Sequence, residues 1–111
     1  MSPGQAIRTL QADLGLTPVD LQMILGTTPR HIERWGANQA YPQTKARYRL
    51  AELMELHRHL ITMFTAWEGA RAWLAAPSRY LAGVSPLEVL RAGRLDRARE
   101  ALTALDAGVY L

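Results

Sequence analysis

Four Ser-Pro or Thr-Pro pairs punctuate this chain, and they constrain its fold more than any other feature. The pairs begin at Ser2, Thr17, Thr28 and Ser85. A Ser or Thr side chain can accept a hydrogen bond from the backbone at the start of a helix, and a proline at the first helical position has no N–H that needs a partner. Each pair therefore predicts the start of a helix.

Glycines recur where such helices should end. They are Gly15, Gly26, Gly36, Gly83, Gly93 and Gly108. Glycine adopts the left-handed conformation that follows a last helical turn without a side-chain clash, and no segment alternates apolar and polar residues for long enough to predict a strand. We expect an all-α protein with helices at 3–14, 18–25, 29–36, 43–65, 67–76, 86–92 and 95–107, and a short turn at 78–82.

Residues 17–35 have the pattern of a helix-turn-helix. Thr17 and Thr28 would each begin a short helix, and Gly26 would end the first. Four apolar residues are spaced to meet between the two helices: Leu21, Leu25, Ile32 and Trp35. The second helix would then expose Arg30, His31, Glu33 and Arg34. Because the recognition helix of this motif lies in the DNA major groove, the segment predicts a DNA-binding unit.

Positive charge is concentrated in and after the second of these helices. The chain has a net charge of +3 and an isoelectric point of about 9.8, and residues 28–49 hold five Lys and Arg residues against the single anion Glu33. Such a local excess favours contacts with phosphate groups. We expect DNA contacts from Thr28, Arg30, His31, Arg34, Lys45 and Arg47. The alternatives are a solvated basic surface and a helical hairpin that does not bind DNA.

Residues 43–65 predict a long amphipathic helix. Its apolar residues occupy roughly half of the helix circumference, and they are Leu50, Leu53, Met54, Leu56, Leu60, Ile61, Met63 and Phe64. A stripe of this width normally needs two partners. We expect the helix-turn-helix on one side, and the C-terminal helices or the second subunit of a homodimer on the other. His57 lies within the stripe and is expected to be a packed or interface residue.

The residue types that several other functions require are absent or badly placed. The 111 residues contain no cysteine, which excludes disulfides and thiolate metal sites. His57 and His59 are two positions apart on a predicted helix, so their side chains diverge and cannot share a metal. There is no nucleophile elbow, glycine-rich phosphate loop, membrane-spanning run or secretion-signal pattern. We expect a cytoplasmic protein that is not an enzyme and that needs no metal or cofactor.

Residues 67–111 predict helices that complete the core. A helix at 67–76 would stop before Pro77, and inward-facing apolar residues follow at Leu95, Ala98, Leu102 and Leu105. The simplest interpretation is a cap on the long helix. The chain ends, however, on Gly108, Val109, Tyr110 and Leu111. An apolar segment with a tyrosine after a helix-ending glycine is typical of an anchor for a partner protein.

The C-terminal region also carries a family motif, WLAAPSRYLAGVSPLEVLRAG, at residues 73–93. With the terminal Gly-Val-Tyr, it resembles the Xre/MbcA/ParS-type antitoxins of RES–Xre toxin–antitoxin systems. The matching positions are Trp73, Leu74, Pro77, Leu81, Gly83, Pro86, Leu87, Leu90, Gly93, Leu102, Gly108, Val109 and Tyr110. The N-terminal half is similar to the family's helix-turn-helix at residues 14–17, 29–30, 34–35 and 42–43. The chain departs from the pattern at 94–96, where many members carry a glycine-containing acidic turn.

The resemblance implies both a function and a partner. Family members neutralise a RES-domain toxin, which consumes NAD or transfers ADP-ribose from it, by covering its active site with their C-terminal region. Many also repress their own operon through the helix-turn-helix. The implied toxin contacts are Gly108, Val109, Tyr110 and Leu111. Charge and position add Arg79, Arg91 and Arg94 as contacts around them.

The expected organisation has three parts: a helix-turn-helix DNA-binding region at 1–42, a connecting and dimerisation helix at 43–65, and a toxin-binding domain at 66–111. A homodimer would bind a palindromic operator, because the symmetry of the DNA site mirrors that of the protein. The first alternative is a solitary helix-turn-helix transcriptional regulator without a toxin partner. The second is a helical interaction module that has lost DNA binding.

Overall fold

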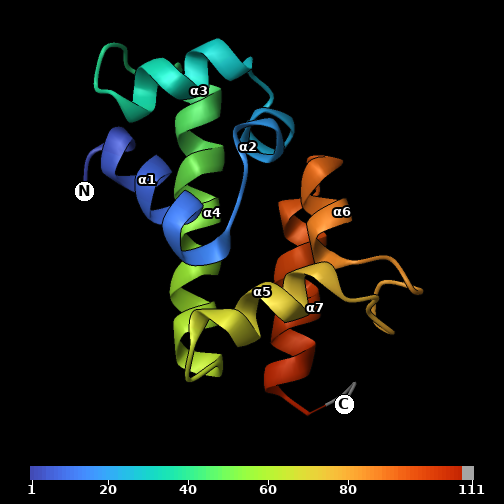
Figure 1. Cartoon of the computed structure of the whole chain (residues 1–111). Helices are drawn as coiled ribbons and strands as arrows, with labels where there is room; N and C mark the ends of the chain where they lie inside the picture. The colour runs from blue at the N-terminus through green and yellow to red at the C-terminus, as the bar shows by residue number, and fades with distance from the viewer. Residues whose placement is uncertain (109–111) are drawn as a thin grey trace.

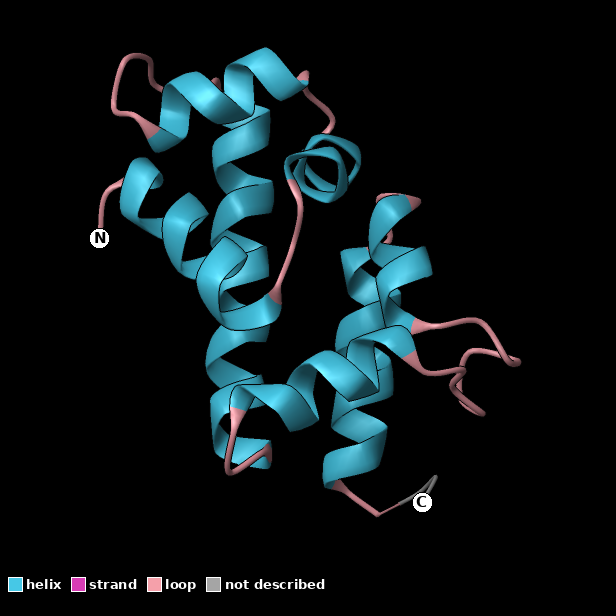
Figure 2. Ribbon diagram, in the orientation of Figure 1, coloured by secondary structure: helices cyan, strands magenta, loops and turns pink. Residues whose placement is uncertain are grey.

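The computed structural model describes residues 1–108, and these residues form seven α-helices and no strand (Figures 1 and 2). The helices are α1 (Pro3–Leu14), α2 (Pro18–Leu25), α3 (Pro29–Gly36), α4 (Thr44–Met63), α5 (Trp67–Ala75), α6 (Pro86–Arg91) and α7 (Leu95–Asp106). The all-α prediction is confirmed. The first three helices have the predicted bounds, whereas the last four end one or two residues earlier than predicted, and the expected turn occupies residues 79–83.

All four Ser-Pro and Thr-Pro pairs begin helices, as predicted. The hydroxyl of each Ser or Thr accepts a hydrogen bond from the backbone N–H three residues later, which gives the caps of Ser2, Thr17, Thr28 and Ser85. A cap of this kind stabilises a helix by about 1 kcal/mol. Gly15 and Gly26 follow α1 and α2 in the left-handed conformation, each with a φ of 67°. The corners of the helix-turn-helix are therefore fixed by local chemistry.

Helix α4 is the central helix, and four of the other helices pack against it (Figure 1). α1 and α2 pack against it from one side of the core, and α5 and α7 contact it from the other. The buried side chains of α4 include Leu50, Leu53, Leu56 and Leu60. Of the two partners left open for the second side, the structure therefore shows the C-terminal helices.

The predicted apolar stripe of α4 is wider than the surface that these helices cover. Ile61 belongs to the predicted stripe, but its side chain is 55% exposed. The residues around it on the same face include Arg58 and Thr62, which are also exposed. The neighbouring helices therefore leave this part of the predicted stripe open to solvent within residues 1–108.

One continuous apolar core joins both halves of the chain. It runs from Ala6 in α1 through Leu53 and Leu60 in α4 to Leu102 in α7. The apolar residues predicted to meet between α2 and α3 are all buried: Leu21, Leu25, Ile32 and Trp35. No helix in residues 1–108 is long and apolar enough to cross a membrane.

Truncation of a fully buried residue of α4 tests this arrangement. Leu60→Ala should lower the free energy of unfolding by about 2–5 kcal/mol, because it removes part of a fully buried side chain from the shared core and leaves a cavity. Ile61→Ala, at the neighbouring exposed position, should change it by less than about 0.5 kcal/mol. Urea denaturation followed by circular dichroism measures both values. Equal losses in the two variants would show that the α4 side chains are oriented differently.

Candidate functional site

The exposed face of α3 is the first part of the candidate site. Thr28 caps the helix by accepting the N–H of His31 at 3.2 Å, and Ile32 and Trp35 anchor its inner face in the core. The outer face therefore exposes Arg30, His31, Glu33 and Arg34, as the sequence predicts. Because α2 and α3 are capped and packed independently of any ligand, this face is ordered before a partner binds.

His31 is held in a defined orientation on this face. Its Nδ1 lies 2.8 Å from the hydroxyl of Thr27. Its ring stacks on Trp35 with the centroids 5.7 Å apart and the planes 15° apart. Nε2 is the ring nitrogen that remains for a partner. Pre-organisation of this kind lowers the entropy lost on binding.

The start of α4 adds further cations beside α3. His31, Arg34 and Lys45 all line one pocket of about 370 Å³, which is bounded by Trp35 and Tyr41. The structure thus brings together three of the six residues that the sequence predicts to contact DNA. Two others, Thr28 and Arg30, lie at the start of α3 outside this pocket.

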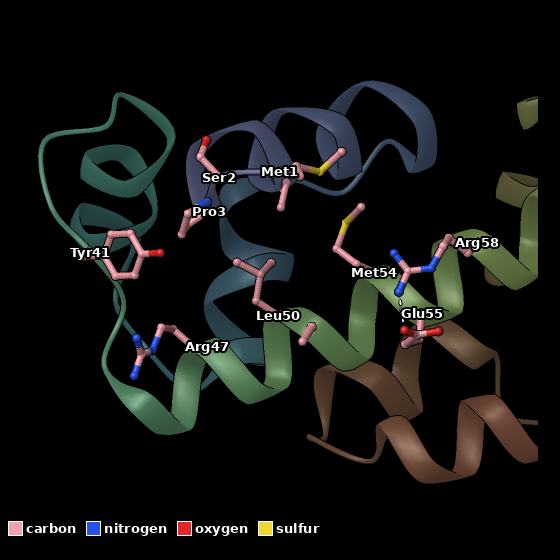
Figure 3. Close-up of a pocket in the computed structure, with 11 residues that line it drawn as sticks. Met1, Ser2, Pro3, Tyr41, Arg47, Leu50, Met54, Glu55 and Arg58 are labelled. Carbon is pink, nitrogen blue, oxygen red and sulfur yellow. Dashed lines mark hydrogen bonds and ion pairs between the residues drawn. The ribbon is translucent and has the colours of Figure 1, made fainter.

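Arg47, the sixth predicted contact, lies on the other side of Tyr41. Its guanidinium carbon is 5.8 Å from the centre of the Tyr41 ring, and its Nη2 donates to the hydroxyl of Thr44 at 3.3 Å. It lines a separate groove of about 380 Å³ between the N-terminus and α4 (Figure 3). Its apolar lining includes Leu50 and Met54, and Arg47 is near one end of it.

The cations of this region are not neutralised by the rest of the protein. Among residues 1–108, the ion pairs are His57–Asp13, Arg58–Glu55, His59–Asp106, Arg91–Asp20, Arg94–Asp96 and Arg97–Glu100. None of them involves a residue between Thr28 and Arg49. A surface whose cations lack internal carboxylate partners is suited to a polyanion.

Two basic residues near this face were not predicted as contacts. Arg8 of α1 donates a hydrogen bond to the carbonyl of Gly36 at the end of α3. Arg49 lies against the turn between α2 and α3. If Gly26 carried a Cβ atom, Nη1 of Arg49 would be only 2.6 Å from it. Arg49 belongs to the basic segment 28–49 that the sequence analysis identified, so its charge was counted there although it was not predicted as a contact. Nothing local in the sequence predicts Arg8, because only the packing of α1 against α3 brings it there.

The three arginines predicted to contact a toxin have different surroundings. Arg91, the last residue of α6, pairs with Asp20 of α2 at 2.7 Å. Arg94 pairs with Asp96 at 2.9 Å and, mainly through that hydrogen bond, lowers the pKa of Asp96 to about 2. Arg79 is exposed and has no ion pair among the described residues. Arg79 therefore differs from Arg91 and Arg94, which both have carboxylate partners inside the protein.

Asp20 links the helix-turn-helix to the C-terminal helices. Its carboxylate is buried, and it accepts the N–H of Thr17 at 2.9 Å and the Nε–H of Arg91 at 2.8 Å. Burial alone would raise the pKa of this carboxyl. The hydrogen bonds from Thr17 and the guanidinium of Arg91 together outweigh burial and hold the pKa of Asp20 below its usual value of 3.8.

His57 is a packed residue, as the sequence predicts. It is 7% exposed, its Nε2 lies 2.8 Å from Oδ2 of Asp13, and its ring stacks on Trp67 at 4.7 Å. His59 faces Asp106 instead, at 3.1 Å. Within residues 1–108, no group of three or more His, Cys, Asp or Glu side chains is placed to hold a metal ion.

Of the predicted C-terminal contact segment 108–111, the structure describes Gly108. Gly108 is exposed just after α7, and its N–H donates to the carbonyl of Leu105 at 3.0 Å. The predicted contacts Val109, Tyr110 and Leu111 lie outside the described residues.

The Asp20–Arg91 pair gives a pH-dependent prediction. Arg91→Ala should destabilise the protein by about 1–3 kcal/mol at pH 7, because a buried carboxylate loses its charged hydrogen-bond donor. The folded pKa of Asp20 lies below 3.8. The loss should therefore be complete above that pH and shrink as the pH falls through the folded pKa, where protonation removes the charge.

Urea denaturation of the wild type and the variant between pH 7 and pH 2.5 measures this effect. Arg94→Ala is the matched control, because Arg94 forms its ion pair with the exposed Asp96, and it should leave the free energy of unfolding nearly unchanged. A loss in Arg91→Ala that does not depend on pH would contradict the assignment.

Known proteins resemble this chain over most of its length, although no protein-family model matches it. Mycobacterial cidal antitoxin MbcA of Mycobacterium tuberculosis is 31% identical over 98 residues, which cover 88% of this chain and 86% of that protein. The probable mycobacterial cidal antitoxin Rv3188 of the same organism is 31% identical over 98 residues, covering 87% and 82%. A chain in the crystal structure of the M. tuberculosis MbcT–MbcA toxin–antitoxin complex matches with a TM-score of 0.74 at 28% identity, over 97% of this chain and 96% of that chain. The chain therefore belongs to the MbcA family of antitoxins, which confirms the resemblance found in its C-terminal motif.

Proposed function

We propose that this antitoxin binds and neutralises a RES-domain toxin by covering its active site, and that it represses its own operon through the helix-turn-helix. The toxin would consume NAD or transfer ADP-ribose from it. The observation that carries the toxin partner is the similarity to a chain of the MbcT–MbcA complex, because that similarity extends over 97% of this chain.

The toxin-binding part of the proposal rests on the C-terminal region, residues 66–111. Gly108 is exposed at the end of α7, so a partner can reach this end of the fold. The proposed toxin contacts are Arg79, Arg91, Arg94, Gly108, Val109, Tyr110 and Leu111. In the protein alone, Arg91 and Arg94 are already held by Asp20 and Asp96.

The DNA-binding part of the proposal rests on the uncompensated cations around α3. Arg30 and Arg34 are one helical turn apart and both exposed, so they are placed to reach base edges or phosphates in one groove. Lys45 and Arg47 would contact the DNA backbone. A homodimer would bind a two-fold symmetric operator, and the groove between the N-terminus and α4 in Figure 3 offers apolar surface for such an interface.

A solitary helix-turn-helix regulator is the second candidate. The basic face supports DNA binding whether or not a toxin exists, so this candidate explains α3 as well as the first does. It leaves the C-terminal motif without a role. A RES-domain gene beside the gene for this chain would favour the antitoxin over the solitary regulator, and the lack of one would weaken the antitoxin proposal.

Removal of the C-terminal residues tests neutralisation. A chain that ends at Ala107 should fail to protect bacteria that express the RES-domain toxin, because the residues proposed to cover the active site are gone. Growth on co-expression measures protection. Full protection by the shortened chain would overturn the role of residues 108–111. Arg99→Ala in the full-length chain, an exposed position on α7, should still protect.

Substitution of the recognition helix tests DNA binding. Arg30→Ala combined with Arg34→Ala should abolish specific binding to promoter DNA in a mobility-shift assay. Two contacts of about 1–3 kcal/mol each correspond to at least about a 30-fold loss of affinity. Arg99→Ala, far from α3, serves as the control for a general change in charge. Unchanged binding by the double variant would remove both arginines from the proposed interface.

A further inference from the structure

A pocket of about 280 Å³ lies where the end of α5, the loop that follows it and α7 meet. The residues around it are mostly apolar or aromatic, and they include Trp73, Pro77, Tyr80, Ala101 and Leu105, with Arg79 beside them. Pockets for drug-sized ligands usually have volumes of about 300–1,000 Å³. This pocket is at the lower end of that range and its lining is mostly apolar, which fits a single bulky apolar side chain from another protein.

The loop that carries Arg79 is rigidly built. The N–H of Ser78 donates to the carbonyl of Val84 at 3.0 Å, and the N–H of Gly83 donates back to the carbonyl of Ser78 at 2.8 Å. Leu81 anchors the loop in the core with 5% exposure, and the guanidinium of Arg97 lies 5.3 Å from the centre of the Tyr80 ring. Arg79 is therefore presented from a fixed backbone, which reduces the entropy lost when a partner binds.

The surroundings of Arg79 indicate what a partner must supply. Four other arginines of the C-terminal half are used inside the protein: Arg71, Arg91, Arg94 and Arg97. Arg79 has no carboxylate in reach among residues 1–108, although it borders an apolar pocket. A guanidinium in this position forms its strongest hydrogen bonds with a carboxylate.

The position of the pocket connects it with the proposed toxin-binding segment. Leu105 lines the pocket, and its carbonyl accepts the N–H of Gly108, where that segment begins. The basic face of α3 lies at the other end of α4 from the end of α7 (Figure 1). A partner in this pocket would therefore lie close to Gly108 and leave α3 uncovered.

We propose that this pocket, with Arg79 at its edge, is a docking site for the toxin, which inserts an apolar side chain there and places a carboxylate against Arg79. The inference rests on the proposed toxin-binding function and extends it. Two contact points would follow: residues 108–111 cover the toxin active site, and the pocket holds the antitoxin in place beside it.

The affinity of the full-length chain for a purified RES-domain toxin tests this site. Arg79→Glu reverses the charge, and Ala76→Glu introduces a carboxylate at an exposed position that lines the pocket. Each substitution should weaken binding at least tenfold in calorimetric titrations. Arg99→Glu makes the same change of charge on α7, outside this pocket, and should alter the affinity less than threefold. Thermal melting checks that all the variants are folded.

Each outcome of this experiment has a distinct meaning. If the wild type binds the toxin and both pocket variants bind equally well, the docking site is wrong while the proposed function stands. If the wild type itself does not bind, the proposed function and the docking site both fail. If the variants change only the self-association of the antitoxin in sedimentation experiments, the pocket is a contact between copies, which overturns the proposal.

Discussion

The structure depends on the burial of α4 from two sides. At about 100° per residue, the buried side chains of α4 span an arc of about 160°, with Met54 at one edge and Leu56 at the other. This arc is wider than one neighbouring helix covers. α1 and α2 cover part of this arc, and α5 and α7 cover another part. Neither half of the chain can therefore exclude water from α4 alone. The proposed division into regions 1–42, 43–65 and 66–111 is a division of function on one shared core.

Polar contacts reinforce this dependence at the corner between α1 and α2. Arg71 of α5 donates to the carbonyls of Ala12 and Asp13 at 2.8 Å each, and Arg91 of α6 holds Asp20. Asp20 also completes the cap of α2 with Thr17. The C-terminal helices thus fix the end of α1 and the start of α2. The orientation of the helix-turn-helix is set partly by residues that lie more than fifty positions later in the chain.

The difference between local and distant chemistry explains what the sequence alone could predict. The start of α3 was predictable because Thr28, Pro29 and His31 make the cap within four residues. The Asp20–Arg91 pair and the contact of Arg8 with Gly36 were not, because their partners are 71 and 28 positions apart. Charge and position alone grouped Arg79 with Arg91 and Arg94. Only the folded structure shows that the latter two already have partners.

The basic face of α3 and the end of α7, where Gly108 lies, are at opposite ends of α4 (Figure 1), so a toxin held at the end of α7 and a DNA duplex on α3 should bind at the same time. Sedimentation of the full-length antitoxin with both the RES-domain toxin and promoter DNA of the antitoxin's own operon tests simultaneous binding most directly. The account predicts a ternary complex that is larger than either binary complex. Release of the DNA as the toxin is added, at concentrations where each binds alone, would contradict it and show that the two surfaces overlap or oppose each other.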